Sequence, residues 1–194
     1  MPLADTLLRM AEDPRLYSPK WSRTILDEVT RNLVAKWDMP VAKARRREAA
    51  IRLHFPEALV EGDGPLIPEM TNDPGDRHVL AAASVSQCGA IVTYNRRHFP
   101  PASLDPLGIE AIGPSEFLCR LYDLDPTSFV GKLHDQAAAI EAPLDRLLGS
   151  LAKNAPSFVD FFTARRLTAV RARIAGVSGT ASLGQEPQSV VDWG

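Results

Sequence analysis

The segment from 72 to 99 constrains the fold more than any other part of the chain. It begins with two carboxylates, Asp73 and Asp76, which precede an alanine-rich helix. A short apolar strand at 90–93 follows that helix and leads to Asn95 in a basic loop. A helix that runs directly into a buried strand is typical of α/β proteins with a parallel sheet. Because ligands bind at the carboxyl ends of such strands, the surroundings of Asn95 are a candidate functional site.

The chain on either side of this segment also alternates between helix and strand. Apolar residues recur at helical spacing after Ser22, a good N-cap, and Glu28 lies on the flank of that apolar stripe. A flank position reaches either a cleft or open water. We therefore predict a short parallel sheet with helices on both faces. The other predicted elements are helices at 3–12 and 41–54, strands at 58–61 and 108–112, and a helix that starts at 113–115.

The last third of the chain is predicted to be mainly helical. Helices are expected at about 128–141, after Pro143 and after Pro156. The last two are rich in leucine and phenylalanine, so we expect them to pack against a core. Residues 176–194 are rich in Gly, Ser, Gln and Pro, and we expect disorder there. The predicted organisation is an α/β domain at 1–122, a helical extension at 123–165, and at 166–194 a helix end with a disordered tail.

The composition is that of an ordinary globular protein, with 45% apolar and 24% charged residues among 194. A net charge of −2 argues against general non-specific binding to nucleic acid, which relies on many phosphate contacts. Arg45–Arg47 and Arg96–His98 remain as local basic clusters. Cys88 and Cys119 lack metal-ligand spacing and fit buried thiols in a reducing compartment. We see no apolar run of about 18 residues and no secretory signal, and we expect a cytoplasmic protein without a membrane span.

The acidic turn has two physical explanations. In the first, Asp73 is the N-cap of a helix and Asp76 its third residue, and both stabilise the helix start. In the second, the same carboxylates supply the hard oxygen ligands that Mg²⁺ requires. Metal-assisted phosphodiester hydrolysis needs several such ligands at one sheet edge. The candidates are Glu28, Asp73 and Asp76, with Asn95 as a neutral ligand or water-positioning group and Thr93 in support.

Three motifs resemble the PIN-domain ribonucleases, and in particular the larger VapC-like toxins of bacterial type II toxin–antitoxin pairs. They are the acidic helix start from Asp73 to Ala83, the strand and tip from Ile91 to Phe99, and the stretch from Trp21 to Val29, where the family has a helix-borne glutamate. The resemblance covers roughly residues 3–118. It implies a PIN-like three-layer α/β fold, and the helical C-terminal extension is similar to that of some large VapC-like toxins.

The resemblance also implies a Mg²⁺-dependent endoribonuclease, with Mn²⁺ as an alternative metal. Many family members carry an aspartate where this chain has Asn95, so a second ion should bind more weakly here. The implied partners are an RNA substrate and a cognate antitoxin protein, and a homodimer is one assembly left open. The implied site consists of the metal ligands Glu28 and Asp76, the further catalytic residues Asp73 and Asn95, and the RNA contacts Thr93, Arg96 and Arg97.

The sequence departs from the family at its start. Members begin with an apolar strand that ends in an aspartate, whereas this chain begins with the helix predicted at 3–12. We therefore expect the central strand and its metal ligand to be absent, and Met1 to be an internal methionine of a longer reading frame or a truncation point. A rival interpretation is a PIN-like module that binds RNA or protein and has lost catalysis. A third is a plain α/β domain whose two aspartates only cap a helix.

Overall fold

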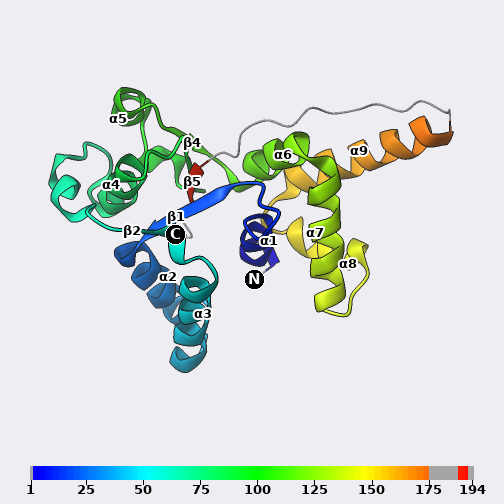
Figure 1. Ribbon diagram of the computed structural model, residues 1–194, viewed down its shortest axis with the longest axis horizontal. Coiled ribbons are helices and arrows are strands. Elements are labelled where there is room, and N and C mark those ends of the chain that lie inside the picture. The colour runs from blue at the N-terminus through cyan, green and yellow to red at the C-terminus, as the bar shows by residue number, and fades with distance from the viewer. Residues whose placement is uncertain (1, 175–187, 192–194) are drawn as a thin grey trace. The chain divides into compact units, whose positions relative to one another are not determined.

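The computed structural model describes the backbone of residues 2–174 and 188–191, and the side chains of 2–168, 189 and 190. The chain forms two compact units (Figure 1). The sheet unit comprises Ser18–Gly113 and Pro187–Gly194, and the helical unit comprises Met1–Tyr17 and Pro114–Glu186. This division differs from the predicted boundaries at 122 and 165, because the first helix joins the helices that follow residue 113.

The sheet unit is built on a parallel sheet, which in the described residues has the strand order β2-β1-β5-β3-β4. Every residue of β3 is buried, as is usual for an inner parallel strand. The prediction of an α/β fold with a short parallel sheet is therefore confirmed, and the architecture is consistent with a PIN-like fold. The strands are β1 (Ser18–Ser22), β2 (Leu59–Val60), β3 (Ala90–Val92), β4 (Glu110–Ile112) and β5 (Gln188–Val191).

The helices of the sheet unit are α2 (Arg23–Ala35), α3 (Val41–His54), α4 (Arg77–Val85) and the single turn α5 (Pro101–Leu104). Ser22 caps α2 as predicted, since its hydroxyl oxygen accepts a hydrogen bond from the Ile25 N–H at 3.4 Å. α4 packs against β1, β3 and β5, and α3 lies beside α2 (Figure 1). The alanines at 81–83 in α4 are fully buried, and their small side chains let the helix approach the strands closely.

Two predictions from the sequence are wrong at β5. Residues 188–191 lie in the segment predicted to be disordered, yet they form a strand, while residues 176–187 and 192–194 lie outside the described residues. The sheet also has a strand at its centre, where we expected one to be missing. Val190 pairs with Lys20 of β1 on one side and with Ile91 of β3 on the other. Pairing on both edges and complete burial of Ser189 and Val190 stabilise a segment that has no strand periodicity of its own.

The helical unit consists of α1 (Pro2–Met10), α6 (Pro114–Leu124), α7 (Pro126–Ala139), α8 (Leu144–Leu151) and α9 (Pro156–Ile174). The aromatic rings of Phe129, Phe158 and Phe162 contact one another and are fully buried. The leucines of α8 are also buried. The expectation that this apolar region packs is therefore confirmed. α1 belongs to the same core because it packs against α7 and α8.

Neither cysteine is arranged as a reactive thiolate. Cys88 is buried as predicted, whereas Cys119 is only partly buried, and burial raises the pKa of both thiols. Among the described helices, none combines the length and the apolar character needed to cross a bilayer.

Candidate metal centre

Asp73 precedes one turn of 3₁₀ helix, Pro74–Asp76, and Asp76 is the last residue of that turn, which leads into α4. Asp73 is the N-cap of this turn, and its Oδ1 accepts a hydrogen bond from the Gly75 N–H at 3.0 Å. Asp76 occupies the N-cap position of α4, but its side chain makes no capping hydrogen bond. Both aspartates therefore have the positions that the helix-start interpretation predicted, with Asp73 at the N-cap and Asp76 third in the first turn, but the side chain of Asp76 is left available for another partner.

The loop that follows β3 is tied to this acidic turn. The Thr93 hydroxyl oxygen accepts a hydrogen bond from the Asn95 N–H at 3.0 Å, and the Thr93 N–H donates to the Ile112 carbonyl of β4 at 2.9 Å. Further along the loop, the His98 carbonyl accepts a hydrogen bond from the Asp73 N–H at 3.1 Å. These bonds hold the carboxyl end of β3 beside the start of α4.

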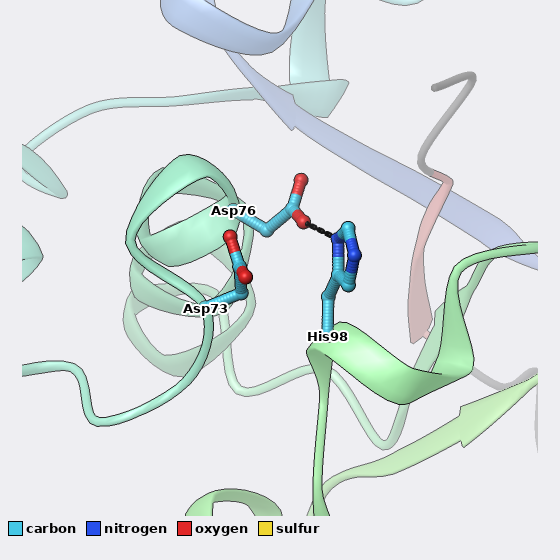
Figure 2. A group of neighbouring side chains, drawn as sticks. All are labelled: Asp73, Asp76 and His98. Carbon is cyan, nitrogen blue, oxygen red and sulfur yellow. Dashed lines mark hydrogen bonds and ion pairs between the residues drawn. The ribbon is translucent and has the colours of Figure 1, made fainter.

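Asp73, Asp76 and His98 form an acidic cluster, a name we use below for these three residues. One potential ligand atom from each lies within 4.8 Å of the others. His98 Nδ1 and Asp76 Oδ2 are 2.5 Å apart. Figure 2 shows the Asp76 carboxylate turned toward the imidazole ring, with the Asp73 carboxylate beside it. The Asp76 and His98 side chains are 16% and 26% exposed, whereas Asp73 is exposed, so a ligand can reach the cluster from solvent.

A second hydrogen bond defines the role of His98. Arg97 Nε donates to His98 Nε2 at 3.1 Å. Because a guanidinium group can only donate, Nε2 must be the unprotonated ring nitrogen. The ring proton is then on Nδ1, which donates to Asp76 Oδ2. His98 therefore orients the Asp76 carboxylate, and the second oxygen of Asp76 is left for a ligand.

Glu28 has a different partner. Its Oε2 lies 3.0 Å from His78 Nε2, within ion-pair distance although not in hydrogen-bond geometry. His78 is buried in α4, two residues after Asp76, and the Glu28 side chain is 36% exposed. Glu28 thus reaches the first turn of α4 from α2, but the structure does not bring it into the acidic cluster.

The other predicted site residues lie at the end of β3 or in the loop that follows it, and they differ in their exposure to solvent. Asn95 is half-buried, and Arg96 and Arg97 are exposed on the 3₁₀ turn Arg96–His98. Thr93 is only 1% exposed, so its position supports a role in holding the loop rather than in touching RNA. The loop therefore presents two guanidinium groups beside the acidic cluster.

Sequence reasoning did not place His98 in the site. The residue was grouped with Arg96 and Arg97 as part of a basic cluster, because no zinc-type spacing involves it. His98 lies beside Asp76 because the chain turns back in the 3₁₀ turn that follows Asn95. The sequence of this turn has no hydrophobic periodicity from which the turn could be predicted. The available hint was its position, six residues beyond the end of a buried strand, in the loop at the functional edge of the sheet.

The donor set of the acidic cluster fits a hydrated Mg²⁺ or Mn²⁺ ion. These ions prefer carboxylate and water ligands, whereas imidazole favours the later transition metals. Because both nitrogens of His98 are engaged by Asp76 and Arg97, the carboxylates remain as ligands. Asn72, adjacent to Asp73, is 3% exposed, and its side-chain amide has no hydrogen-bond partner within the described residues. A buried amide of this kind has the capacity to bind a water molecule.

Over 67 residues the chain is 45% identical to a protein of Mycobacterium tuberculosis (strain ATCC 25618 / H37Rv) described as "Putative ribonuclease VapC50". The aligned region is 34% of this chain and 40% of that protein, so the chain spans less than half of the relative's length. No family model matches the chain. No solved structure matches it either. The similarity supports the resemblance to VapC-like PIN ribonucleases.

Proposed function

We propose that the chain is a metal-dependent endoribonuclease of the kind found as the toxin of type II toxin–antitoxin pairs, with Mg²⁺ or Mn²⁺ as its cofactor. Its substrate is RNA, its protein partner is a cognate antitoxin, and both meet it in the cytoplasm. The similarity to VapC50 supports the ribonuclease class. The observation that carries the proposal is the convergence of Asp73, Asp76 and His98 beside the carboxyl end of β3.

Helix capping does not explain this convergence. Asp73 caps its turn, but the Asp76 carboxylate is directed at His98 instead of at the N–H groups of α4. Two carboxylates held this close repel each other, and one neutral imidazole does not cancel both charges. A bound cation removes this repulsion, so the arrangement is better suited to an ion than to structural support alone.

In phosphodiester hydrolysis, the residues of the site have separate roles. A bound divalent ion supplies Lewis acidity and a more nucleophilic water. Asp73 and Asp76 would hold the ion, and the Nδ1–H of His98 keeps Asp76 in position. Arg96 and Arg97, exposed on the adjacent turn, bind phosphates of the RNA chain. A water oxygen forms a bond to phosphorus and releases a proton to solvent, while the bond from phosphorus to the departing ribose oxygen breaks and that oxygen takes up a proton from solvent.

A second candidate is a PIN-like module that binds RNA or protein without cleaving RNA. One observation favours it: within the described residues, the acidic cluster contains two carboxylates, and Glu28 is directed at His78 instead. Two carboxylates are enough to bind a hydrated ion but few for a site that holds two ions about 3.5–4 Å apart.

Metal-dependent cleavage separates the two candidates. We expect the purified chain to cleave a single-stranded fluorophore–quencher RNA in the presence of Mg²⁺ or Mn²⁺, and EDTA to stop the reaction. Restoring excess Mn²⁺ should restore the rate. Equal cleavage with and without EDTA would contradict the metal requirement. Binding of the same RNA without cleavage in saturating Mn²⁺ would favour the non-catalytic module.

Glu28 remains a proposed ligand of the site, and its position allows a direct test. Replacing Glu28 by Gln should weaken Mn²⁺ binding about 10-fold, a typical effect for a residue at the periphery of a metal site. Asp27→Asn is the matched control, because Asp27 is the exposed neighbour on α2 and loses the same charge. Isothermal titration calorimetry with Mn²⁺ measures both. Equal affinities for the two variants would mean that Glu28 serves only as the ion-pair partner of His78.

A further inference from the structure

Tyr94 places an aromatic ring in solvent at the carboxyl end of β3. The residue is 59% exposed, and among the described aromatic residues only Trp37, at 57%, is as open to solvent. Tyr94 directly precedes Asn95 in the loop that contributes His98 to the acidic cluster. The exposed ring therefore lies at the edge of the sheet where a substrate of the acidic cluster would bind.

The backbone on both sides of Tyr94 is held in place. Before it, Thr93 is buried and makes the two hydrogen bonds described above, with the Asn95 N–H and the Ile112 carbonyl. After it, the His98 N–H donates to the Asn95 carbonyl at 2.8 Å. Burial also raises the pKa of the Tyr94 hydroxyl, because the protein partly shields the end of the ring from water. A tyrosine on so constrained a backbone can contact a ligand at a small cost in conformational entropy.

The other side chains of this loop indicate what the ring contacts. A single exposed aromatic residue is common on protein surfaces and does not by itself mark a site. Arg96 and Arg97, however, follow Tyr94 within three positions, and both are exposed. Trp37, by contrast, is flanked in the sequence by one basic and one acidic residue, whose charges cancel. An aromatic ring together with guanidinium groups is suited to single-stranded nucleic acid, because bases stack on the ring and phosphates pair with the cations.

We propose that Tyr94 is a specificity-determining residue whose ring stacks on an unpaired base of the RNA, while Arg96 and Arg97 bind the adjacent phosphates. This inference rests on the proposed function, because it takes RNA as the ligand of this edge of the sheet. It extends that function by selecting one form of RNA. The bases of an A-form duplex are stacked on one another, so an exposed ring can reach the face of a base only in a loop, a bulge or a single strand.

Equilibrium binding to a short, fluorophore-labelled single-stranded RNA tests the stacking role. Fluorescence anisotropy in EDTA, where the proposed metal-dependent cleavage cannot occur, gives Kd for the full chain and its variants. Tyr94→Ala should weaken binding at least about 5-fold, the lower end of the effect of removing a stacked aromatic residue. Tyr94→Phe keeps the ring and should bind as the wild type does. Trp37→Ala is the matched control, because it removes an equally exposed aromatic side chain from outside the loop, and its affinity should be unchanged.

An abasic ribose–phosphate chain of the same length separates stacking from a structural role. It has the phosphates of the RNA and none of its bases, so Tyr94→Ala should bind it as tightly as the wild type does. An equal loss of affinity for the RNA and for the abasic chain would overturn the proposal, because Tyr94 would then only hold the arginine-bearing loop in place. A Tyr94→Phe variant as weak as Tyr94→Ala would overturn it too, since the hydroxyl and not the face of the ring would then be the binding group.

A duplex of the same RNA sequence tests the selection of unpaired bases. The wild type should bind the single strand more tightly than the duplex, and Tyr94→Ala should reduce this preference by about the same 5-fold factor. A preference that the substitution leaves unchanged would refute the specificity role.

The wild-type titration distinguishes failure of this inference from failure of the proposed function. If wild type and Tyr94→Ala bind the single-stranded RNA equally tightly, stacking on Tyr94 is refuted while the proposed ribonuclease stands. If the wild type itself neither binds nor cleaves RNA, the proposed function fails and the role of Tyr94 fails with it.

Discussion

Asp76→Asn is expected to reduce metal-dependent RNA cleavage by roughly 100-fold or more, because a metal ion contributes several kcal/mol to stabilising the charge that develops at phosphorus. Asparagine has the same shape and can still accept a hydrogen bond from His98 Nδ1. It lacks the negative charge that holds a divalent ion. Initial cleavage rates at saturating Mn²⁺ and at a tenth of that concentration separate weaker binding from slower chemistry.

The same substitution should change the free energy of unfolding by only about 1 kcal/mol or less, since a charge near a helix N-terminus contributes about that much and Asp76 makes no capping hydrogen bond. Asp145→Asn is the matched control, because Asp145 lies in the first turn of α8 and its side chain is 93% exposed. Cleavage by Asp76→Asn at the wild-type rate would remove this residue from the metal site. A large loss of stability without a change in metal affinity would support the purely structural interpretation.

Local patterns explain why the region from 72 to 99 was predictable. The alanine-rich helix, the apolar run of β3 and the acids before the helix are each encoded within a few consecutive residues. The capping role of Asp73 follows from the preferences of aspartate and proline at a helix start. The direction of the Asp76 carboxylate does not, because it depends on a histidine that lies 22 positions away in the sequence.

β1 and β5 were not predicted because their stability is not local. β1 contains Pro19 and Lys20, and shows no alternation of apolar and polar residues. It becomes a strand through pairing with β2 and β5 on its two edges. β5 has four residues and follows a segment of low periodicity, so its preference for a strand comes from the neighbouring strands.

The position of Glu28 shows which features of a functional site can be predicted from helical periodicity and which cannot. The helical repeat correctly placed this residue on the flank of α2, half-exposed. It could not determine which residue of α4 the side chain would meet, because that depends on the packing of one helix against the other. In the structure this partner is His78, one half-turn beyond Asp76.

A charge placed in β5 should have the largest effect on stability. Val190 is fully buried, between Lys20 of β1 and Ile91 of β3. Val190→Asp removes an apolar side chain from the core and puts a carboxyl group there. The Lys20 ammonium is already bonded to the Glu57 carbonyl, so an ion pair with it would require that bond to break. We expect a loss of about 4 kcal/mol or more in the free energy of unfolding.

A loss of that size approaches the whole stability of a typical domain, which is about 5–15 kcal/mol. Urea unfolding followed by tryptophan fluorescence measures it, because Trp21 in β1 is buried beside this part of the sheet. Val41→Asp is the control: Val41 is 51% exposed at the start of α3, where an acidic side chain is tolerated. That variant should stay within about 0.5 kcal/mol of the wild type.

The outcome for Val190→Asp also bears on the metal site. Because β5 is the central strand, its loss separates β1 from β3, and β3, which leads into the loop with His98, then loses one of its two neighbouring strands. Mn²⁺ affinity should then fall together with stability. Wild-type stability in Val190→Asp would mean that residues 188–191 are not part of the folded core.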